Sequence, residues 1–355
     1  MASVIGWDIG GVNVKGARLV FEGTEAVSGH AIRRYFEIWK EKEHLPSLLR
    51  ELSTKLGPAD AMAVTMTAEI ADIFNDKAEG VAFVLGAVRV AASGTPLYLL
   101  SLDGKLVHYK GQAVDPLDFA STNWIAEALA LADRRPDCLL VDVGSTTTDL
   151  IPILGGTLAA KGRRDVERLA SGELIYTGAL RTPVPAIVSQ VPLRGTLCRI
   201  SAEYYAIAAD VHLVLGRLTP EQYTCSTPDG RGKTEEEALA RLARVACEDR
   251  KGLTPAETRA IGSYVAEKQL QQITEGMFQV LSRIEGGFDL PVVPVGVGAF
   301  LGVACAKRLN LALCNPPALT DGDAPLSPSV GAAYLLGRAL SRSPARPEGH
   351  ATPPP

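Results

Sequence analysis

One pattern occurs twice in this chain and constrains its fold more than any other feature. A short apolar run ends in Asp8, a glycine-rich turn follows, and a second apolar run covers 17–21. The same order returns at Asp142, which ends the run 138–143 and precedes Gly-Ser-Thr-Thr-Thr-Asp and the run 150–154. Short apolar runs bounded by Gly and Asp turns are typical of β-strands. The two copies are too far apart for a solenoid repeat, so the pattern predicts a duplicated α/β unit.

The segments around these two copies show both helical and strand periodicities. Apolar spacing predicts a helix over 45–56 that ends at Gly57, and a buried strand over 61–67. Residues 69–79 are expected to form a helix closed by Gly80. The runs 98–102 and 105–109, joined by Asp-Gly, predict a hairpin. In the second half, a strand is expected at 291–295, and helices are expected at 118–133, 202–215, 235–247, 255–284 and 330–340.

Composition excludes several classes of protein. The 40 acidic and 36 basic residues give a net charge of −4, which disfavours a duplex-DNA binder. No apolar stretch reaches the roughly 18 residues of a membrane helix, and no basic N-terminal region indicates a signal peptide. The 6 cysteines form no CxxC pair and the 5 histidines lack zinc-ligand spacing. We therefore expect a cytoplasmic protein whose partners are neither nucleic acid nor membrane.

The length of 355 residues predicts two domains or one large one, and the duplicated pattern favours two. We expect the first to cover 1–115 and the second to cover 116–327, with a helical insertion at about 200–285. The helix predicted near 328–340 is expected to pack back on the first domain. The proline-rich segment 341–355 is expected to be a disordered tail.

Both glycine-rich turns have the composition of a phosphate-binding loop. Without a Cβ, backbone N–H groups can approach an anion closely, and hydroxyl or ammonium groups add donors. An aspartate at each strand end, Asp8 and Asp142, can hold Mg²⁺ against phosphate oxygens. The phosphate-binding candidates are Gly10, Gly11, Asn13 and Lys15 in the first turn, and Gly144, Ser145, Thr146, Thr147 and Asp149 in the second. Two ordinary polar turns are the open alternative.

Acidic side chains are concentrated in the expected helix after residue 68. Glu69, Asp72 and Asp76 are spaced so that they would share one helix face, and Lys77 lies beside Asp76. Clustered carboxylates are costly unless water, a partner or a cation compensates them. A solvated acidic face and a functional site both fit this pattern.

The two turns resemble the phosphate motifs of the actin, Hsp70 and sugar-kinase superfamily. The matching patterns are Asp8-x-Gly-x-x-x-x-Lys15 and Asp142-x-Gly-x-x-Thr147. The stretch 296–302 sits where that superfamily has its adenosine loop, which adds Gly296 and Gly298 to the phosphate-binding candidates. The resemblance implies an α/β fold of two ribonuclease-H-like domains around a central cleft, with Asp8 and Asp142 facing each other across it. The sequences of both turns are most similar to those of the hydantoinase A/oxoprolinase branch.

A closer resemblance covers nearly the whole chain. Residues 6–17, 65–80, 141–149 and Arg181-Thr-Pro-Val-Pro resemble the tetrahydromethanopterin-linked C1-transfer pathway proteins, a group that includes the methanofuran-biosynthesis synthase. Such a transferase joins an aminomethylfuran-methyl diphosphate to the phenol of γ-glutamyltyramine, which forms an aryl ether and releases diphosphate. The resemblance implies that 65–80, its most specific stretch, lines the site. Glu69 or Asp72 would then take the phenolic proton, with Lys77 in the same catalytic group.

Other functions of the same superfamily stay open on the sequence. The resemblance implies Mg²⁺ and leaves the use of ATP open. An ATP-dependent kinase, a hydantoinase/oxoprolinase-like hydrolase and a non-catalytic nucleotide-sensing protein are the alternatives. Tight ATP binding with slow hydrolysis would favour the sensor, and steady ATP turnover would favour an ATPase. Binding of diphosphate without nucleotide would favour the synthase. No pattern indicates the oligomeric state.

Overall fold

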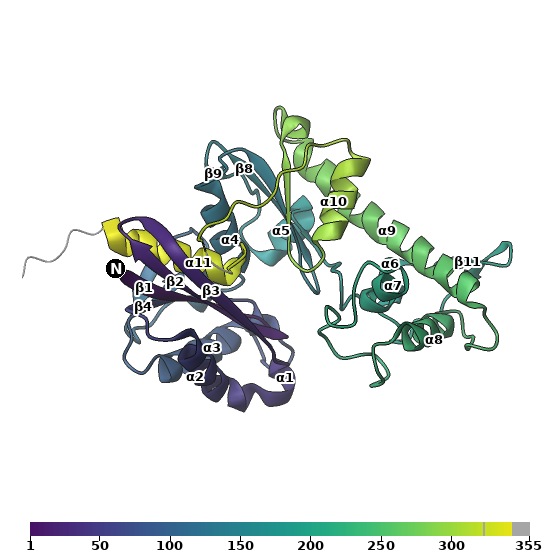
Figure 1. Cartoon of the computed structure of the whole chain (residues 1–355), viewed down its shortest axis with the longest axis horizontal. Helices are drawn as coiled ribbons and strands as arrows, with labels where there is room; N and C mark the ends of the chain where they lie inside the picture. The colour runs from purple at the N-terminus through teal and green to yellow at the C-terminus, as the bar shows by residue number, and fades with distance from the viewer. Residues whose placement is uncertain (322–323, 343–355) are drawn as a thin grey trace, which may run out of the picture. The chain divides into compact units, whose positions relative to one another are not determined.

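The computed structural model describes residues 1–321 and 324–342, which form two compact units (Figure 1). The first unit contains Met1–Ala130 and the described residues from Ala318 onward. The second unit contains Leu131–Pro317.

The first unit is built on a six-stranded sheet with the strand order β3-β2-β1-β4-β5-β6. The strands β1, β2 and β3 form an antiparallel meander, whereas β4 runs parallel to β1 and β5 runs parallel to β4. This order is that of a ribonuclease-H-like domain, so the expected fold class is confirmed. The strand bounds are β1 Ala2–Ile9, β2 Asn13–Glu22, β3 Glu25–Tyr35, β4 Ala61–Met66, β5 Leu97–Leu100 and β6 Leu106–Tyr109.

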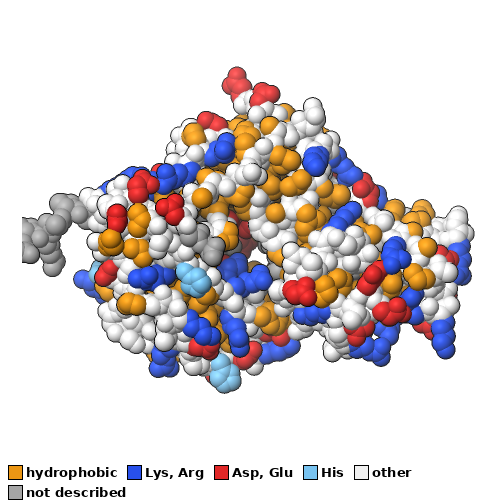
Figure 2. All heavy atoms as spheres, in the orientation of Figure 1, with side chains coloured by type: hydrophobic (Ala, Val, Ile, Leu, Met, Phe, Trp, Pro, Cys, Tyr) orange, Lys and Arg blue, Asp and Glu red, His pale blue; other side chains and the backbone are white. Residues whose placement is uncertain are grey.

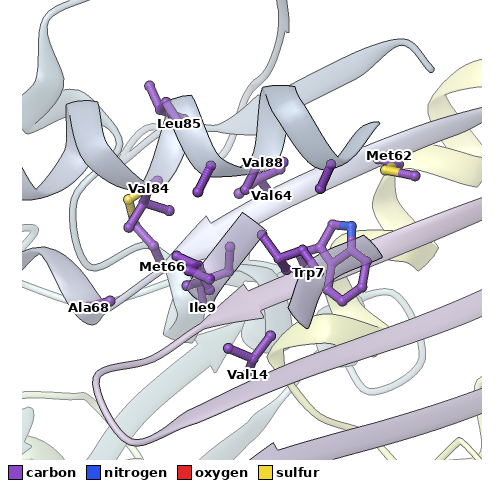
Figure 3. Packing of buried hydrophobic residues seen from close by; sticks show 14 of the residues in the cluster. Trp7, Ile9, Val14, Met62, Val64, Met66, Ala68, Val84, Leu85 and Val88 are labelled. Atoms are coloured by element: carbon purple, nitrogen blue, oxygen red, sulfur yellow. The ribbon is translucent and has the colours of Figure 1, made fainter. Parts of the chain in front are cut away.

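Helices supply the crossovers that parallel strands require. The helix α2 occupies Leu45–Leu56 and ends at Gly57, as predicted. In Figure 3, Val84 and Val88 of α3 lie over Met66 and Val64 of β4, and all four side chains are buried. The last described helix, α11, contacts β1, β2 and β4. The remaining bounds in this unit are α1 Ile38–Glu41, η1 Lys42–His44, η2 Ala68–Ile70, α3 Lys77–Ala92, η3 Pro116–Asp118, α4 Asn123–Ala132 and α11 Pro328–Arg342.

The second unit repeats the central arrangement of the first. Its main sheet has the order β10-β8-β7-β13, with β9 paired to β8. The strand β7 lies between an antiparallel neighbour, β8, and a parallel one, β13, just as β1 lies between β2 and β4. The strands are β7 Cys138–Val143, β8 Thr148–Leu154, β9 Thr157–Leu158, β10 Leu174–Ile175 and β13 Val292–Val295, with a separate hairpin of β11 Gln190–Leu193 and β12 Thr196–Arg199. The duplicated sequence pattern therefore corresponds to a duplicated strand arrangement.

Three helices of the second unit lie in the segment expected to form an insertion. They are α7 Ala208–Val214, α8 Glu235–Val245 and α9 Pro255–Leu281. Acidic and basic side chains are interspersed over α8 and the adjacent end of α9 (Figure 2), as on an ordinary solvated surface. No helix in the described ranges is long and apolar enough to cross a bilayer. The remaining helices are α5 Asp165–Ser171, α6 Val184–Ile187, η4 Gly287–Asp289 and α10 Ala299–Arg308.

The boundaries of the units differ from those expected at 115/116 and 327/328. The structure places them after Ala130 and after Pro317. The start of α4 belongs to the first unit because Ser121 and Thr122 form buried hydrogen bonds to the segment after β4 and to β4 itself. The helix α11 also extends to Arg342, so 341–342 are not part of a tail. The rest of the predicted tail, 343–355, lies outside the described residues.

Candidate functional site

A buried carboxylate in β1 and a cation in β2 flank the turn that joins these strands. Asp8 and Lys15 face each other across β1 and β2, and the Lys15 Nζ lies 2.9 Å from the Asp8 Oδ2. The Gly10 N–H donates to the Asn13 carbonyl at 2.9 Å and closes the turn. Asp8 is only 3% exposed, and its Oδ1, like the Asn13 Oδ1, has no hydrogen-bond partner within the described residues. A buried acceptor of this kind is costly, so the turn suits a ligand that brings positive charge or donors.

The turn after β7 has the same backbone but different charges. The Gly144 N–H donates to the Thr147 carbonyl at 2.9 Å, which matches the closure of the first turn. In the register position that holds Lys15 in the first unit, the second unit holds Asp149, which faces Asp142. Like charges directly opposite each other destabilise a strand pair. Arg168 of α5 compensates here, because its Nη1 lies 2.8 Å from the Asp149 Oδ1. Asp149 is thus held in a buried ion pair, and its role in phosphate binding stays a prediction.

The glycines after β13 lie against this second turn. Gly296 has a φ of +84°, and a Cβ added there would collide with the Asp142 Oδ1 and the Val143 carbonyl. The Gly298 N–H donates to that same Val143 carbonyl at 2.8 Å. The structure therefore brings Gly296 and Gly298 together with the turn that the sequence assigned to phosphate binding.

Replacing Gly296 with alanine should disturb the position of Asp142. The positive φ and the collision together should lower the free energy of unfolding by about 2–4 kcal/mol and weaken any ligand binding at this turn. Thermal unfolding and titration with inorganic pyrophosphate would measure both effects. Gly86→Ala is the control, because Gly86 lies in α3 with nothing within 4 Å of an added Cβ. Equal stability of Gly296→Ala and wild type would contradict the collision.

The prediction of a helix over 69–79 is wrong. One 3₁₀ turn covers Ala68–Ile70, and the chain then turns before α3 begins at Lys77. Asp76 is the N-cap of α3, because its Oδ1 accepts a hydrogen bond from the Glu79 N–H at 2.8 Å. Glu69, Asp72 and Asp76 therefore share no helix face. An aspartate three residues before a glutamate is a helix-start signal, and this signal could have located the true start.

The three catalytic candidates from this stretch lie in different environments. Glu69 is 1% exposed, and its Oε1 accepts a hydrogen bond from the Ser121 Oγ at 2.7 Å. Asp72 is exposed, whereas Lys77 is partly buried at the first residue of α3. β4 runs parallel to β1, so the segment of Glu69 follows the carboxyl end of β4 at the same end of the sheet as Asp8. The Thr67 N–H donates to the Ile9 carbonyl there. Glu69 is thus the candidate base placed beside the first turn.

Ser121 is the residue at this site that the sequence did not indicate. Its φ of +52° is uncommon for a residue other than glycine, and it is 7% exposed. Residues held in such backbone conformations concentrate at functional sites. The next residue, Thr122, shares a 2.9 Å hydrogen bond with Thr65 of β4. These contacts join the start of α4 to the carboxyl end of β4, a long-range pairing with no local sequence signal.

The expected magnesium site stays a prediction. Within 1–321 and 324–342, no group of three or more His, Cys, Asp or Glu side chains is placed to hold a metal. Mg²⁺ is commonly bound through one or two carboxylates together with substrate phosphates and water. The buried Oδ1 of Asp8 is suited to such a role. Asp8 and Asp142 lie in different units, so their sharing of one ion stays a prediction.

Comparison with known proteins identifies the family. The model of the hydantoinase/oxoprolinase family matches residues 60–320. The chain belongs to this family. It is also 38% identical over 281 residues to the (4-{4-[2-(gamma-L-glutamylamino)ethyl]phenoxymethyl}furan-2-yl)methanamine synthase of Methanocaldococcus jannaschii, and the match covers 79% of this chain and 82% of that protein.

Two further comparisons find similar proteins. A synthase of the same name from Methanococcus vannielii is 44% identical over 113 residues, which are 32% of this chain and 50% of that protein. Among solved structures, the nucleotide-free acetone carboxylase, described as acting in ATP-dependent acetone carboxylation, has a TM-score of 0.54 at 10% identity. That match covers 87% of this chain and 67% of the carboxylase chain. At this identity the likeness concerns the fold alone.

Proposed function

We propose that this protein is the ether-forming transferase of methanofuran biosynthesis. The observation that carries the proposal is the 38% identity to the Methanocaldococcus jannaschii synthase across 82% of that protein's length. The donor substrate would be (5-aminomethylfuran-3-yl)methyl diphosphate, and the acceptor would be the phenol of γ-glutamyltyramine. The buried carboxylate of Glu69 and the two glycine-rich turns support the same reading, because this reaction needs a base and an anion site.

The proposed reaction exchanges one carbon–oxygen bond for another. The bond between the furfuryl-type carbon and the diphosphate breaks, and its electron pair leaves with the diphosphate. The furan ring oxygen stabilises the resulting positive charge. The phenol oxygen then bonds to this carbon, and the Glu69 carboxylate takes the phenolic proton. Backbone N–H groups of the turns and the hydroxyls of Ser145, Thr146 and Thr147 would donate hydrogen bonds to the departing diphosphate.

Magnesium has a place in this proposal. Asp8 and Asp142 would hold the ion, and Mg²⁺ would neutralise the charge of the diphosphate. Lys15 keeps the Asp8 carboxylate paired at 2.9 Å, which limits the charge repulsion between this aspartate and an incoming phosphate. Removal of divalent cations with EDTA should then lower diphosphate affinity, and added Mg²⁺ should restore it.

Incubation of the purified protein with both substrates tests the proposal directly. Mass analysis should detect the aryl ether together with an equal amount of released diphosphate. Absence of the ether with both substrates and Mg²⁺ present would overturn the assignment. Steady hydrolysis of ATP without ether formation would favour the kinase or hydrolase alternatives. Tight ATP binding with slow hydrolysis would favour the nucleotide-sensing alternative.

A further inference from the structure

The segment after β10 lies along the second turn. The Ala179 N–H donates to the Gly144 carbonyl at 2.9 Å, and the N–H groups of Leu180 and Arg181 both donate to the Ser145 carbonyl, at 3.1 and 2.8 Å. Three backbone hydrogen bonds therefore fix this segment to the turn that carries the phosphate-binding candidates.

Close packing holds the two backbones together at the same place. A Cβ added to Gly178 would lie 2.5 Å from the Thr146 nitrogen and 2.6 Å from the Ser145 carbonyl carbon. Only glycine fits at this separation. Gln269 of α9 also holds the segment, because its Nε2 donates to the Thr177 Oγ1 at 2.9 Å and to the Gly178 carbonyl at 2.8 Å. The position of Arg181 relative to the turn is therefore set by buried contacts.

The side chain of Arg181 reaches the hydroxyls of the turn. Its Nη1 lies 3.4 Å from the Thr146 Oγ1, and the residue is partly buried. A guanidinium group presents a planar fork of N–H donors that matches two phosphate oxygens at once. The motif Arg181-Thr-Pro-Val-Pro contributes to the family resemblance but has no role in the reaction as described so far. A role for Arg181 in binding an anion at this turn would assign the motif a function.

Two further cations lie near the turns, each beside a carboxylate. The ammonium of Lys15 contacts Asp8, and the guanidinium of Arg168 contacts Asp149. The guanidinium of Arg181 contacts the hydroxyl of Thr146, which is itself one of the phosphate-binding candidates of the second turn.

We propose that Arg181 is a diphosphate-binding residue, whose guanidinium binds the phosphate oxygens held at the turn of residues 144–147. This inference rests on the proposed function, because it assumes that the ligand of the turn is a diphosphate. Arg181 then contacts the leaving group directly and stabilises the charge that develops on it as the carbon–oxygen bond breaks.

Calorimetric titration of the full chain with inorganic pyrophosphate and Mg²⁺ tests this inference. Arg181→Gln should weaken pyrophosphate binding by roughly 10- to 100-fold, because a charge-assisted hydrogen bond is lost. The pyrophosphate affinity of Arg181→Lys should lie between those of wild type and Arg181→Gln, since an ammonium keeps the charge but lacks the planar fork of donors. Arg163→Gln is the matched control, because Arg163 is an exposed arginine of the same unit, and it should bind like wild type.

The outcomes separate this inference from the proposed function. If wild type does not bind pyrophosphate, both are overturned. If wild type and Arg181→Gln bind equally, only the role of Arg181 is overturned. Should the glutamine variant fail to fold, phenylglyoxal labelling of wild type replaces it. Pyrophosphate should protect Arg181 from labelling and leave Arg163 reactive, and labelling of Arg181 that pyrophosphate does not change would overturn the inference.

Discussion

Replacing Arg168 with methionine should lower the free energy of unfolding by about 3–5 kcal/mol. The Arg168 side chain is 2% exposed and pairs with Asp149, whose side chain is 10% exposed. Its Nη2 also donates to the Glu173 carbonyl at 3.1 Å. Methionine fills a similar volume but removes the cation that lies 2.8 Å from the buried Asp149 carboxylate, which stands directly opposite Asp142 on the neighbouring strand. Urea unfolding of the full chain would measure the loss.

A double variant separates the ion pair from simple packing. Asp149→Asn combined with Arg168→Met removes both charges, so it should be more stable than Arg168→Met alone, by about 1–2 kcal/mol. If the double variant is no more stable than the single one, the loss comes from packing and not from the buried charge of Asp149. If Arg168→Met is as stable as wild type, the ion pair is not part of what stabilises the second unit.

This ion pair shows which features of the site could be predicted from the sequence and which could not. The duplicated strands and turns follow from local patterns, because alternation of apolar residues and glycine positions are written in consecutive residues. The pairing of Asp149 with Arg168 depends on how α5 packs on β8, and its partners are not adjacent in sequence. The sequence grouped Asp149 with the turn, whereas it lies in β8, and no local pattern could show that a helix engages its carboxylate.

In the stretch after β4, tertiary contacts also decide the secondary structure. Periodicity alone predicted a helix from residue 69, whereas α3 begins only at Lys77, after the capping Asp76. The actual position of Glu69 depends on tertiary contacts. Gly80 of α3 packs against its backbone, and Ser121 approaches its side chain from a segment distant in sequence. Such contacts override a local preference for helix, which is why the acidic residues separate in the structure.

Replacing Glu69 with glutamine should lower kcat for ether formation by about 10²- to 10⁴-fold, the range expected for loss of a general base. Glutamine keeps the shape of the side chain and an oxygen that can accept the hydrogen bond of Ser121, so the melting temperature should change little. Asp72→Asn is the control, because Asp72 is exposed and its replacement should leave turnover within about twofold of wild type. Rates and melting temperatures of both variants decide between the two candidate bases.

Ser121→Gly adds a test of whether Glu69 must be held in place. Glycine adopts the φ of +52° without strain, which offsets part of the cost of losing the buried hydrogen bond to Glu69, so the melting temperature should fall only modestly. If Glu69 acts as the base, we expect a kcat roughly 10-fold below wild type, because a misplaced base transfers the proton less efficiently. A stable Ser121→Gly protein with full turnover would show that the hydrogen bond is dispensable. Full turnover in Glu69→Gln, or its loss in Asp72→Asn alone, would remove Glu69 from the proposed reaction.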